Sequence, residues 1–222
     1  MEDSQELWLS IKDKLPEQRV ALGAAYSNTY RNDPKAIVFG ASRYKFVSKM
    51  LERNATHVLE VGCGDGFGAP IVAQNVEKLV CTDIDQKQLD DNSNRLSCYQ
   101  NIEFLYHDFR KGSLDRGSDA VFFLDVLEHI YPSECDAFLE NVFGSISDDG
   151  CAIVGVPNKS AESYGSKYSQ LGHVNMMDAD ELTDRLKKYW KTVFIFGMND
   201  EVLHTGFTPL CHYLIAVASN RV

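Results

Sequence analysis

Hydrophobic positions along the chain follow two patterns, short continuous runs and positions spaced three and four residues apart. The continuous runs predict seven β-strands, at residues 58–61, 78–83, 102–106, 119–125, 151–156, 192–196 and 212–218. The spaced positions predict intervening helices, at residues 42–54, 70–76 and 86–96, from Pro132 through Ile146, and from Asp178 through Trp190. Strands that alternate with helices indicate an α/β fold.

The two ends of the chain depart from this alternation. Trp8, Ile11 and Leu15 have helical spacing before Pro16, which predicts a short helix that covers the fold. No helical pattern separates the last two apolar runs, so they cannot form a parallel crossover and must pair antiparallel. The polar and aromatic residues 26–34 form either a loop or frayed helix near a site, or a solvated connector.

A glycine-rich turn follows the first predicted strand. The strand leads directly into glycines at positions 62, 64 and 66. Glycine adopts backbone conformations closed to other residues and lets a ligand approach the main chain. The pattern therefore predicts a cofactor-binding loop. The dinucleotide fingerprint G-x-G-x-x-G needs a glycine at position 67, where this chain has Phe67, so the NAD interpretation is weakened.

The run E-V-G-C-G-D-G at residues 60–66 resembles the first motif of class I S-adenosylmethionine (SAM)-dependent methyltransferases. The resemblance covers about residues 42–218. It implies a Rossmann-like α/β sandwich with a seven-stranded, mostly parallel sheet, an antiparallel last strand and helices on both faces. We therefore expect one domain over residues 1–222, with a helical cap at 1–54, a core at 55–218, and SAM as the cofactor.

An acidic residue ends the second predicted strand, at Asp83. It follows Gly64 by 19 residues, close to the separation at which a nucleotide-binding α/β unit places a carboxylate on the ribose hydroxyls. An ionised carboxylate only accepts hydrogen bonds, which suits two hydroxyl donors. We expect Ile84 to lie against the adenine.

The resemblance implies further cofactor contacts. Asp108 would accept from the adenine amino group and the Phe109 backbone would meet a ring nitrogen; the alternative is an ordinary turn aspartate. Arg43 and Tyr44 would contact the cofactor carboxylate; the alternative is a surface arginine beside a tyrosine at the edge of the core. The full expected cofactor set is Arg43, Tyr44, Glu60, Gly62, Cys63, Gly64, Asp83, Ile84, Asp108, Phe109 and Asp125.

The fourth predicted strand ends in D-V-L-E-H at residues 125–129, at the edge where open α/β sheets bind ligands. This run resembles the fourth motif of many small-molecule methyltransferases, including the ubiquinone-pathway O-methyltransferases. His129 is the first candidate base, because a neutral imidazole is available at physiological pH. His173 is the second candidate, and Glu128 completes the catalytic set. Alternatively, Asp125 caps the next helix and the Glu-His pair lies in its solvated first turn.

A divalent metal is the competing interpretation of the same cluster. Small-RNA terminal 2′-O-methyltransferases use a related E-x-x-E-H run and a later histidine to hold a metal. Here Asp125 replaces the first glutamate, which shortens the arm but keeps an oxygen ligand. The corresponding ligands would be Asp125, Glu128, His129 and His173. We do not favour a metal, since D-x-x-E-H also occurs in methyltransferases that bind none.

Three polar segments, residues 26–33, 161–172 and 199–206, are expected to meet over the acceptor as a lid, because the sheet edge alone leaves the reacting group open to water. Residues 161–172 lack apolar periodicity and predict a flexible loop. An inert loop and a solvated hairpin tip are the alternatives for the second and third segments. The expected acceptor contacts are Tyr26, Tyr30, Asn158, Asn199, Asp200 and His204.

Composition narrows the class of protein. A chain of 222 residues with 44% hydrophobic residues suits one globular domain. The net charge of −10 argues against nucleic acid as a partner, because Lys and Arg bind phosphate backbones. No run approaches the roughly 18 apolar residues of a membrane helix. Six scattered cysteines without a C-x-x-C pair suit reduced thiols. A cytoplasmic protein without a membrane partner is expected.

The sequence therefore predicts a SAM-dependent methyltransferase that acts on a small polar acceptor, with a hydroxyl of a sugar or other metabolite as the leading class. Two other classes stay open. A non-catalytic SAM-binding or partner-binding domain would not need the acid-histidine cluster. A metal-dependent RNA 2′-O-methyltransferase should show a basic track, and this chain is acidic. The sequence indicates no oligomeric state.

Overall fold

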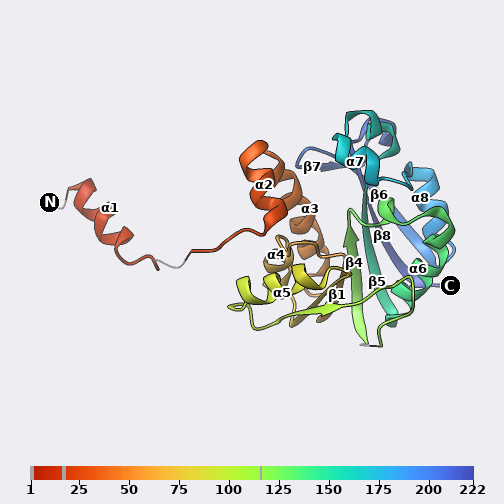
Figure 1. The fold of residues 1–222 in the computed structure, drawn as a ribbon, viewed down its shortest axis with the longest axis horizontal. Helices are drawn as coiled ribbons and strands as arrows, with labels where there is room; N and C mark the ends of the chain where they lie inside the picture. The colour runs from red at the N-terminus through yellow and green to blue at the C-terminus, as the bar shows by residue number, and fades with distance from the viewer. Residues whose placement is uncertain (1–2, 17–18, 116) are drawn as a thin grey trace.

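The computed structural model describes residues 3–16, 19–115 and 117–222, whose strands form one sheet with the order β3-β2-β1-β4-β5-β8-β6-β7 (Figure 1). The strands are β1 His57–Val61, β2 Lys78–Asp83, β3 Ile102–Tyr106, β4 Ser118–Leu124, β5 Ile146–Pro157, β6 Trp190–Asn199, β7 Val202–His204 and β8 Tyr213–Arg221. The expected α/β fold is confirmed. The sheet has eight strands instead of seven, because β7 forms a hairpin with β6.

Strand direction follows the connections. Strands β1 to β5 pair in parallel, and β8 lies between β5 and β6 and is antiparallel to both. The predicted antiparallel arrangement of the final strands is therefore confirmed. In the centre, β4 is buried along almost its whole length, as an apolar strand covered on both faces should be.

Helices cover both faces of the sheet. On one face lie α3 Ala36–Leu51, α4 Ala69–Ala73 and α5 Gln86–Arg95, which bury residues such as Leu51 and Leu89. On the other face lie α6 Pro132–Phe143 and α8 Ala179–Leu186, which bury Leu139 and Leu182. A capping box between Asp178 and Glu181 begins α8. Within the described ranges, no helix combines the length and apolarity needed to cross a membrane.

Two predicted helix ends and one predicted loop are wrong. Ile146 begins β5 and does not end α6, and Trp190 begins β6 and does not end α8. Both side chains are buried, so each continues the helical spacing although the backbone has already changed conformation. Residues 161–172, predicted as a flexible loop, contain most of the 3-10 helix η2 Lys159–Tyr164 and the helix α7 Lys167–Gly172. Ser166 caps α7 by accepting from the Ser169 amide at 3.0 Å.

The N-terminal helix α1, Ser4–Lys12, lies apart from the rest of the molecule (Figure 1). It has no buried residue, so the expectation that it covers the fold is wrong. The next helix, α2 Ala24–Asn32, packs beside α3. Gly23 precedes it and has no side chain to act as a cap; Asp65 of the glycine loop accepts from the Tyr26 amide at 2.8 Å instead. The glycine loop therefore holds the start of α2.

Candidate active site

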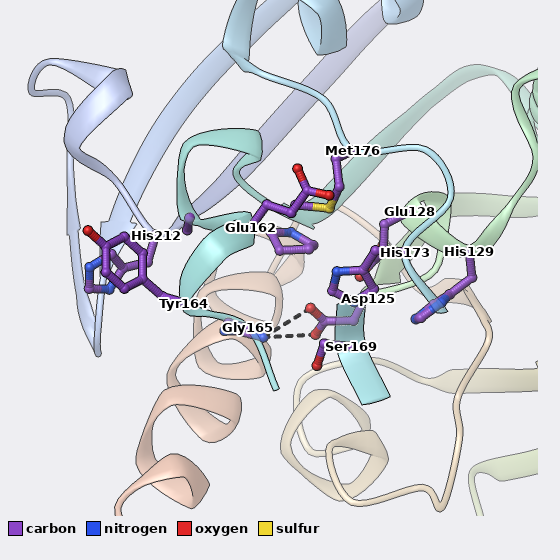
Figure 2. A pocket seen from close by; sticks show the side chains of 13 residues that line it. Asp125, Glu128, His129, Glu162, Tyr164, Gly165, Ser169, His173, Met176 and His212 are labelled. Carbon is purple, nitrogen blue, oxygen red and sulfur yellow. Dashed lines mark hydrogen bonds and ion pairs between the residues drawn. The ribbon is translucent and has the colours of Figure 1, made fainter. Parts of the chain in front are cut away.

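Two cavities open at the edge where the parallel strands end. The glycine-loop cavity, about 330 Å³, is lined by residues that include Gly62, Gly64, Asp83, Ile84, Asp108, Phe109 and Asp125. The histidine cavity, about 610 Å³, is lined by residues that include Arg43, Asp125, Glu128, His129, Tyr164 and His173 (Figure 2). Asp125 and His129 line both cavities. The two cavities therefore adjoin at the end of β4.

The glycine loop is fixed from behind and open in front. The amides of Gly62 and Cys63 donate to the Thr82 carbonyl at 2.8 and 3.0 Å, which ties the loop to β2. Gly62 has a φ of +72°, and a side chain there would overlap Val126. Gly64 has a φ of +52°, and a side chain there would meet no protein atom within 4 Å. The space above Gly64 is therefore free for a ligand.

Asp83 faces this cavity with spare acceptor capacity. Its Oδ2 accepts from the Gly64 amide at 2.9 Å and its Oδ1 from the Asp85 amide at 3.0 Å. A carboxylate has about four lone-pair sites, so each oxygen keeps one site free. Ile84 lies beside it, 56% exposed, in the lining of the same cavity.

Asp108 is buried at the far wall of the glycine-loop cavity. Hydrogen bonds from the Arg110 side chain, at 2.9 and 3.0 Å, hold the pKa of this carboxyl well below its usual range. Asp108 is therefore ionised, and its side chain is held more tightly than that of an ordinary turn aspartate. The Phe109 side chain is buried in the core.

Behind the loop, Glu60 is buried and bonded on both oxygens. The Tyr44 hydroxyl donates to Oε1 at 2.9 Å and the Cys81 thiol to Oε2 at 3.0 Å. Burial raises the pKa of Glu60 to about 7. Among the described residues that line either cavity, Glu60, Tyr44 and Cys63 are absent. These three side chains support the loop from the core.

Arg43 forms an ion pair with Asp125. Its Nη1 donates to both carboxylate oxygens, at 3.1 and 2.9 Å, and the guanidinium lies 3.7 Å from the centre of the Tyr213 ring. The alternatives that Arg43 is a surface residue and that Asp125 caps the next helix are both wrong. The Arg43 side chain is only 24% exposed, and the Asp125 side chain does not cap the 3-10 helix η1 Leu127–His129, which follows it. Asp125 has a φ of +57°, a strained turn for a residue other than glycine.

Glu128 is the unusual residue of the site. It is 1% exposed, and neither carboxylate oxygen has a hydrogen-bond partner among the residues that the structure describes. The alternative that it lies in a solvated helical turn is therefore wrong. Burial raises the pKa of this carboxyl well above its usual value. A buried acid without a partner is costly unless a ligand satisfies it.

The two predicted histidines lie together, as Figure 2 shows, with ring centres 5.1 Å apart. His129 Nδ1 is 2.9 Å from the Gly172 carbonyl, which can only accept, so Nδ1 donates and Nε2 keeps its lone pair. Burial and the neighbouring His129 lower the pKa of His173. Ligand atoms of Glu128, His129 and His173 lie within 4.8 Å of one another. Asp125 is not in this group, and its oxygens pair with Arg43.

The residues that were expected to contact the acceptor lie in different parts of the structure. Tyr26 stacks on Phe67, 3.7 Å between ring centres, beside the glycine loop. Asn158 is buried and donates to the carbonyls of Thr208 and Cys211. Among the described residues, the lining of the histidine cavity includes none of Tyr26, Tyr30, Asn158, Asn199, Asp200 and His204.

Other residues that line the histidine cavity were not predicted individually. Its lining includes Glu162, Tyr164, Ser169, Met176 and His212. The lack of apolar periodicity at residues 161–172 pointed to the first three as part of a segment over the site. Met176 and His212 belong to no motif and lie there only through the packing of the chain.

Comparison with known proteins agrees with this architecture. A family model described as a methyltransferase domain matches residues 58–150. A probable S-adenosylmethionine-dependent methyltransferase of Mycobacterium tuberculosis is 28% identical over 134 residues, which are 60% of this chain and 47% of the relative. A ubiquinone biosynthesis O-methyltransferase of Rickettsia felis is 28% identical over 127 residues, which are 55% of this chain and 48% of the relative. The chain thus spans about half the length of the curated relatives it matches.

Solved structures share the fold. The methyltransferase domain of bacterial CtHen1 superposes with a TM-score of 0.66 at 19% identity, over 82% of this chain and 98% of that one. The N-methyltransferase NodS of Bradyrhizobium japonicum, in complex with S-adenosyl-L-homocysteine, gives a TM-score of 0.62 at 15% identity, over 82% and 87%.

The sheet order, the glycine loop and the acids at the strand ends define a Rossmann-like methyltransferase fold. Residues 58–150 match the methyltransferase-domain family, and the chain is similar to SAM-dependent methyltransferases in sequence and to class I methyltransferases in fold.

Proposed function

We propose that this chain transfers a methyl group from SAM to a small polar acceptor, with a hydroxyl oxygen as the leading acceptor atom. The observation that carries the proposal is that Asp125 and His129 line both cavities. A donor in the glycine-loop cavity and an acceptor in the histidine cavity would meet at this common wall. Holding two reactants in line is the main contribution that a protein makes to such a displacement.

The glycine-loop cavity fits SAM, which supplies the methyl group on a positively charged sulfur. Gly62, Cys63 and Gly64 would lie under the methionine part, where Gly64 leaves open space. The free lone pairs of Asp83 would accept from the ribose hydroxyls, with Ile84 against the adenine. Asp108 would accept from the adenine amino group beside the Phe109 amide.

Arg43 and Asp125 would form the wall between the two ligands. Their ion pair uses both oxygens of Asp125, so we assign Asp125 to the shape and charge of the wall and not to proton transfer. Tyr44 and Glu60 would act indirectly, by supporting the glycine loop from the core.

His129 is the proposed base. The Gly172 carbonyl holds its Nδ1 proton, which leaves Nε2 to take a proton from the acceptor hydroxyl. His173 packs against it and stays neutral because its pKa is lowered, so it would hold the acceptor or the base in place. In this account Glu128 in its neutral form donates to an acceptor oxygen.

A metal-assisted version of the same reaction is favoured by one specific observation, the unpartnered carboxylate of Glu128 within 4.8 Å of two imidazoles. Glu128, His129 and His173 fit a divalent ion, and the mixed oxygen and nitrogen ligands suit Zn, Mn or Fe. Such an ion lowers the pKa of a bound hydroxyl. Glu128 would then be ionised, and no histidine base would be needed.

The choice of a hydroxyl oxygen as the acceptor atom rests on the chemistry of the site. An acid and two histidines suit a hydroxyl, which must lose a proton, and one relative is named as an O-methyltransferase. Although a small RNA methyltransferase has the same fold, the net charge of −10 speaks against an RNA acceptor here. A non-catalytic role leaves the pairing of the two histidines beside the buried Glu128 unexplained.

Metal content before and after exhaustive chelation, together with methyl transfer from radiolabelled SAM to a panel of hydroxylated metabolites, tests the base account. We expect chelation to leave the activity intact and His129→Ala to lower turnover by about 10²–10⁴-fold while affinity for SAM is kept. Activity that disappears on chelation and returns with added Mn²⁺ or Zn²⁺ would support the metal account instead. An active His129→Ala protein without bound metal would rule out both.

A further inference from the structure

Asp108 has no free acceptor site in the structure. Its Oδ1 accepts from the Arg110 amide at 3.1 Å and from Arg110 Nε at 2.9 Å. Its Oδ2 accepts from Arg110 Nη2 at 3.0 Å and pairs with Lys111 Nζ at 3.1 Å. A carboxylate has about four lone-pair sites, and these four contacts fill them. A fifth donor from a ligand can bind only if one of them leaves.

The four contacts are unequal. Lys111 is a single flexible donor whose side chain is 76% exposed, and ion pairs of that kind contribute little. Arg110 supplies the other three, two of them from its planar guanidinium, and it lines the glycine-loop cavity while Lys111 does not. The Lys111 contact is therefore the one that a ligand can displace at small cost.

We propose that Arg110 is a positioning residue that fixes the Asp108 carboxylate to recognise the 6-amino group of adenine, while Lys111 leaves the carboxylate when the cofactor binds. The proposal rests on the proposed SAM binding. Arg110 makes the acid a rigid acceptor, and the departure of Lys111 leaves one acceptor site open on it. An acceptor held in this way selects a ligand with an amino group over one with a carbonyl at the same position.

The test compares S-adenosyl-L-homocysteine with S-inosyl-L-homocysteine, in which an oxygen replaces the amino nitrogen and the neighbouring ring nitrogen N1 carries a hydrogen. Binding is measured by calorimetry, so no acceptor is needed. Wild-type protein should prefer the adenosyl ligand by at least about tenfold. In Arg110→Met the preference should fall to about twofold or less, and Arg110→Lys should restore part of it, because lysine donates from one point only.

Lys111→Met is the matched control, since it removes a contact to the same carboxylate. It should keep the full preference. The proposal is overturned if Arg110→Met weakens both ligands equally, which would make Arg110 a direct or purely structural contact, or if Lys111→Met loses the preference. Wild-type protein that binds both ligands equally also overturns it and leaves SAM binding standing. Wild-type protein that binds neither ligand overturns the proposed function itself.

Discussion

At the scale of single residues, Glu60 shows how burial sets the protonation of an acid behind the cofactor loop. Burial raises its pKa from 4.5 to about 7, so the folded protein binds the proton more tightly than the unfolded chain. This contribution to stability is complete below about pH 4.5 and is lost as the pH rises through about 7.

Glu60→Gln should remove that pH dependence. Glutamine keeps the size of the side chain and cannot ionise. Between about pH 4.5 and 8, the unfolding free energy of the wild type should fall relative to the variant by up to about 3 kcal/mol. Urea unfolding of both proteins at several pH values measures the difference. Parallel profiles would show that Glu60 ionises normally in the folded protein.

The sequence predicted the positions of single acids better than their partners. Asp83, Asp108 and Asp125 each follow an apolar run, and carboxyl ends of parallel strands share one edge of a sheet, so their gathering follows from strand pattern alone. The Arg43–Asp125 pair joins residues that lie 82 positions apart and depends on how α3 packs on the sheet. The burial of Glu128 likewise arises from tertiary packing, and no local pattern signals it.

At the scale of elements, α2 depends on a residue outside itself. Gly23 offers no cap, and Asp65 accepts from the Tyr26 amide across 39 positions of sequence. Asp65→Ala should therefore loosen the first turn of α2 by about 0.5–2 kcal/mol. Hydrogen exchange of residues 24–32 measures this change.

Asp33→Ala is the matched control for that experiment. Asp33 follows the last turn of the same helix, and among the described residues its side chain pairs with exposed Lys35 alone. Faster exchange in the Asp65 variant and unchanged exchange in the Asp33 variant is the expected pattern. Equal exchange in both variants would mean that Asp65 does not anchor α2.

Element boundaries mark where sequence pattern stops being informative. The spacing of buried residues predicted most strands and helices, because each element buries one face or both. At Ile146 and Trp190 a buried residue just beyond a helix has the same spacing as one more helical turn. In η2 and α7 the opposite error occurs, because helices are present where the spacing predicted none. These short helices have no apolar stripe and form through local caps such as Ser166, which a search for periodicity misses.

At the scale of the whole molecule, segments far apart in sequence enclose the site. Residues of the segment 161–172 and His212 border the histidine cavity, and α2 lies against the glycine loop. We expect α2 and residues 161–172 to act as a lid that excludes water from the reacting groups. The predicted third segment of the lid, residues 199–206, supplies no described residue to the lining of the histidine cavity or of the glycine-loop cavity.

Hydrogen exchange with and without S-adenosyl-L-homocysteine tests the lid. The ligand should slow exchange in α2, which contacts the glycine loop. Residues 161–172 should need a bound acceptor as well, because those described border the histidine cavity and not the glycine-loop cavity. Exchange that is the same in every state would mean that neither segment closes.

The central claim, that the glycine-loop cavity binds SAM through Asp83, is tested most directly by calorimetric titration of S-adenosyl-L-homocysteine into wild-type protein and Asp83→Ala. Wild-type protein should bind. The variant should lose up to two charged hydrogen bonds of about 1.5–3 kcal/mol each, not fully additive, so its affinity should fall by at least about tenfold. Unchanged affinity in a folded Asp83→Ala protein, or tight binding of NADH by the wild type in place of this ligand, would contradict the account.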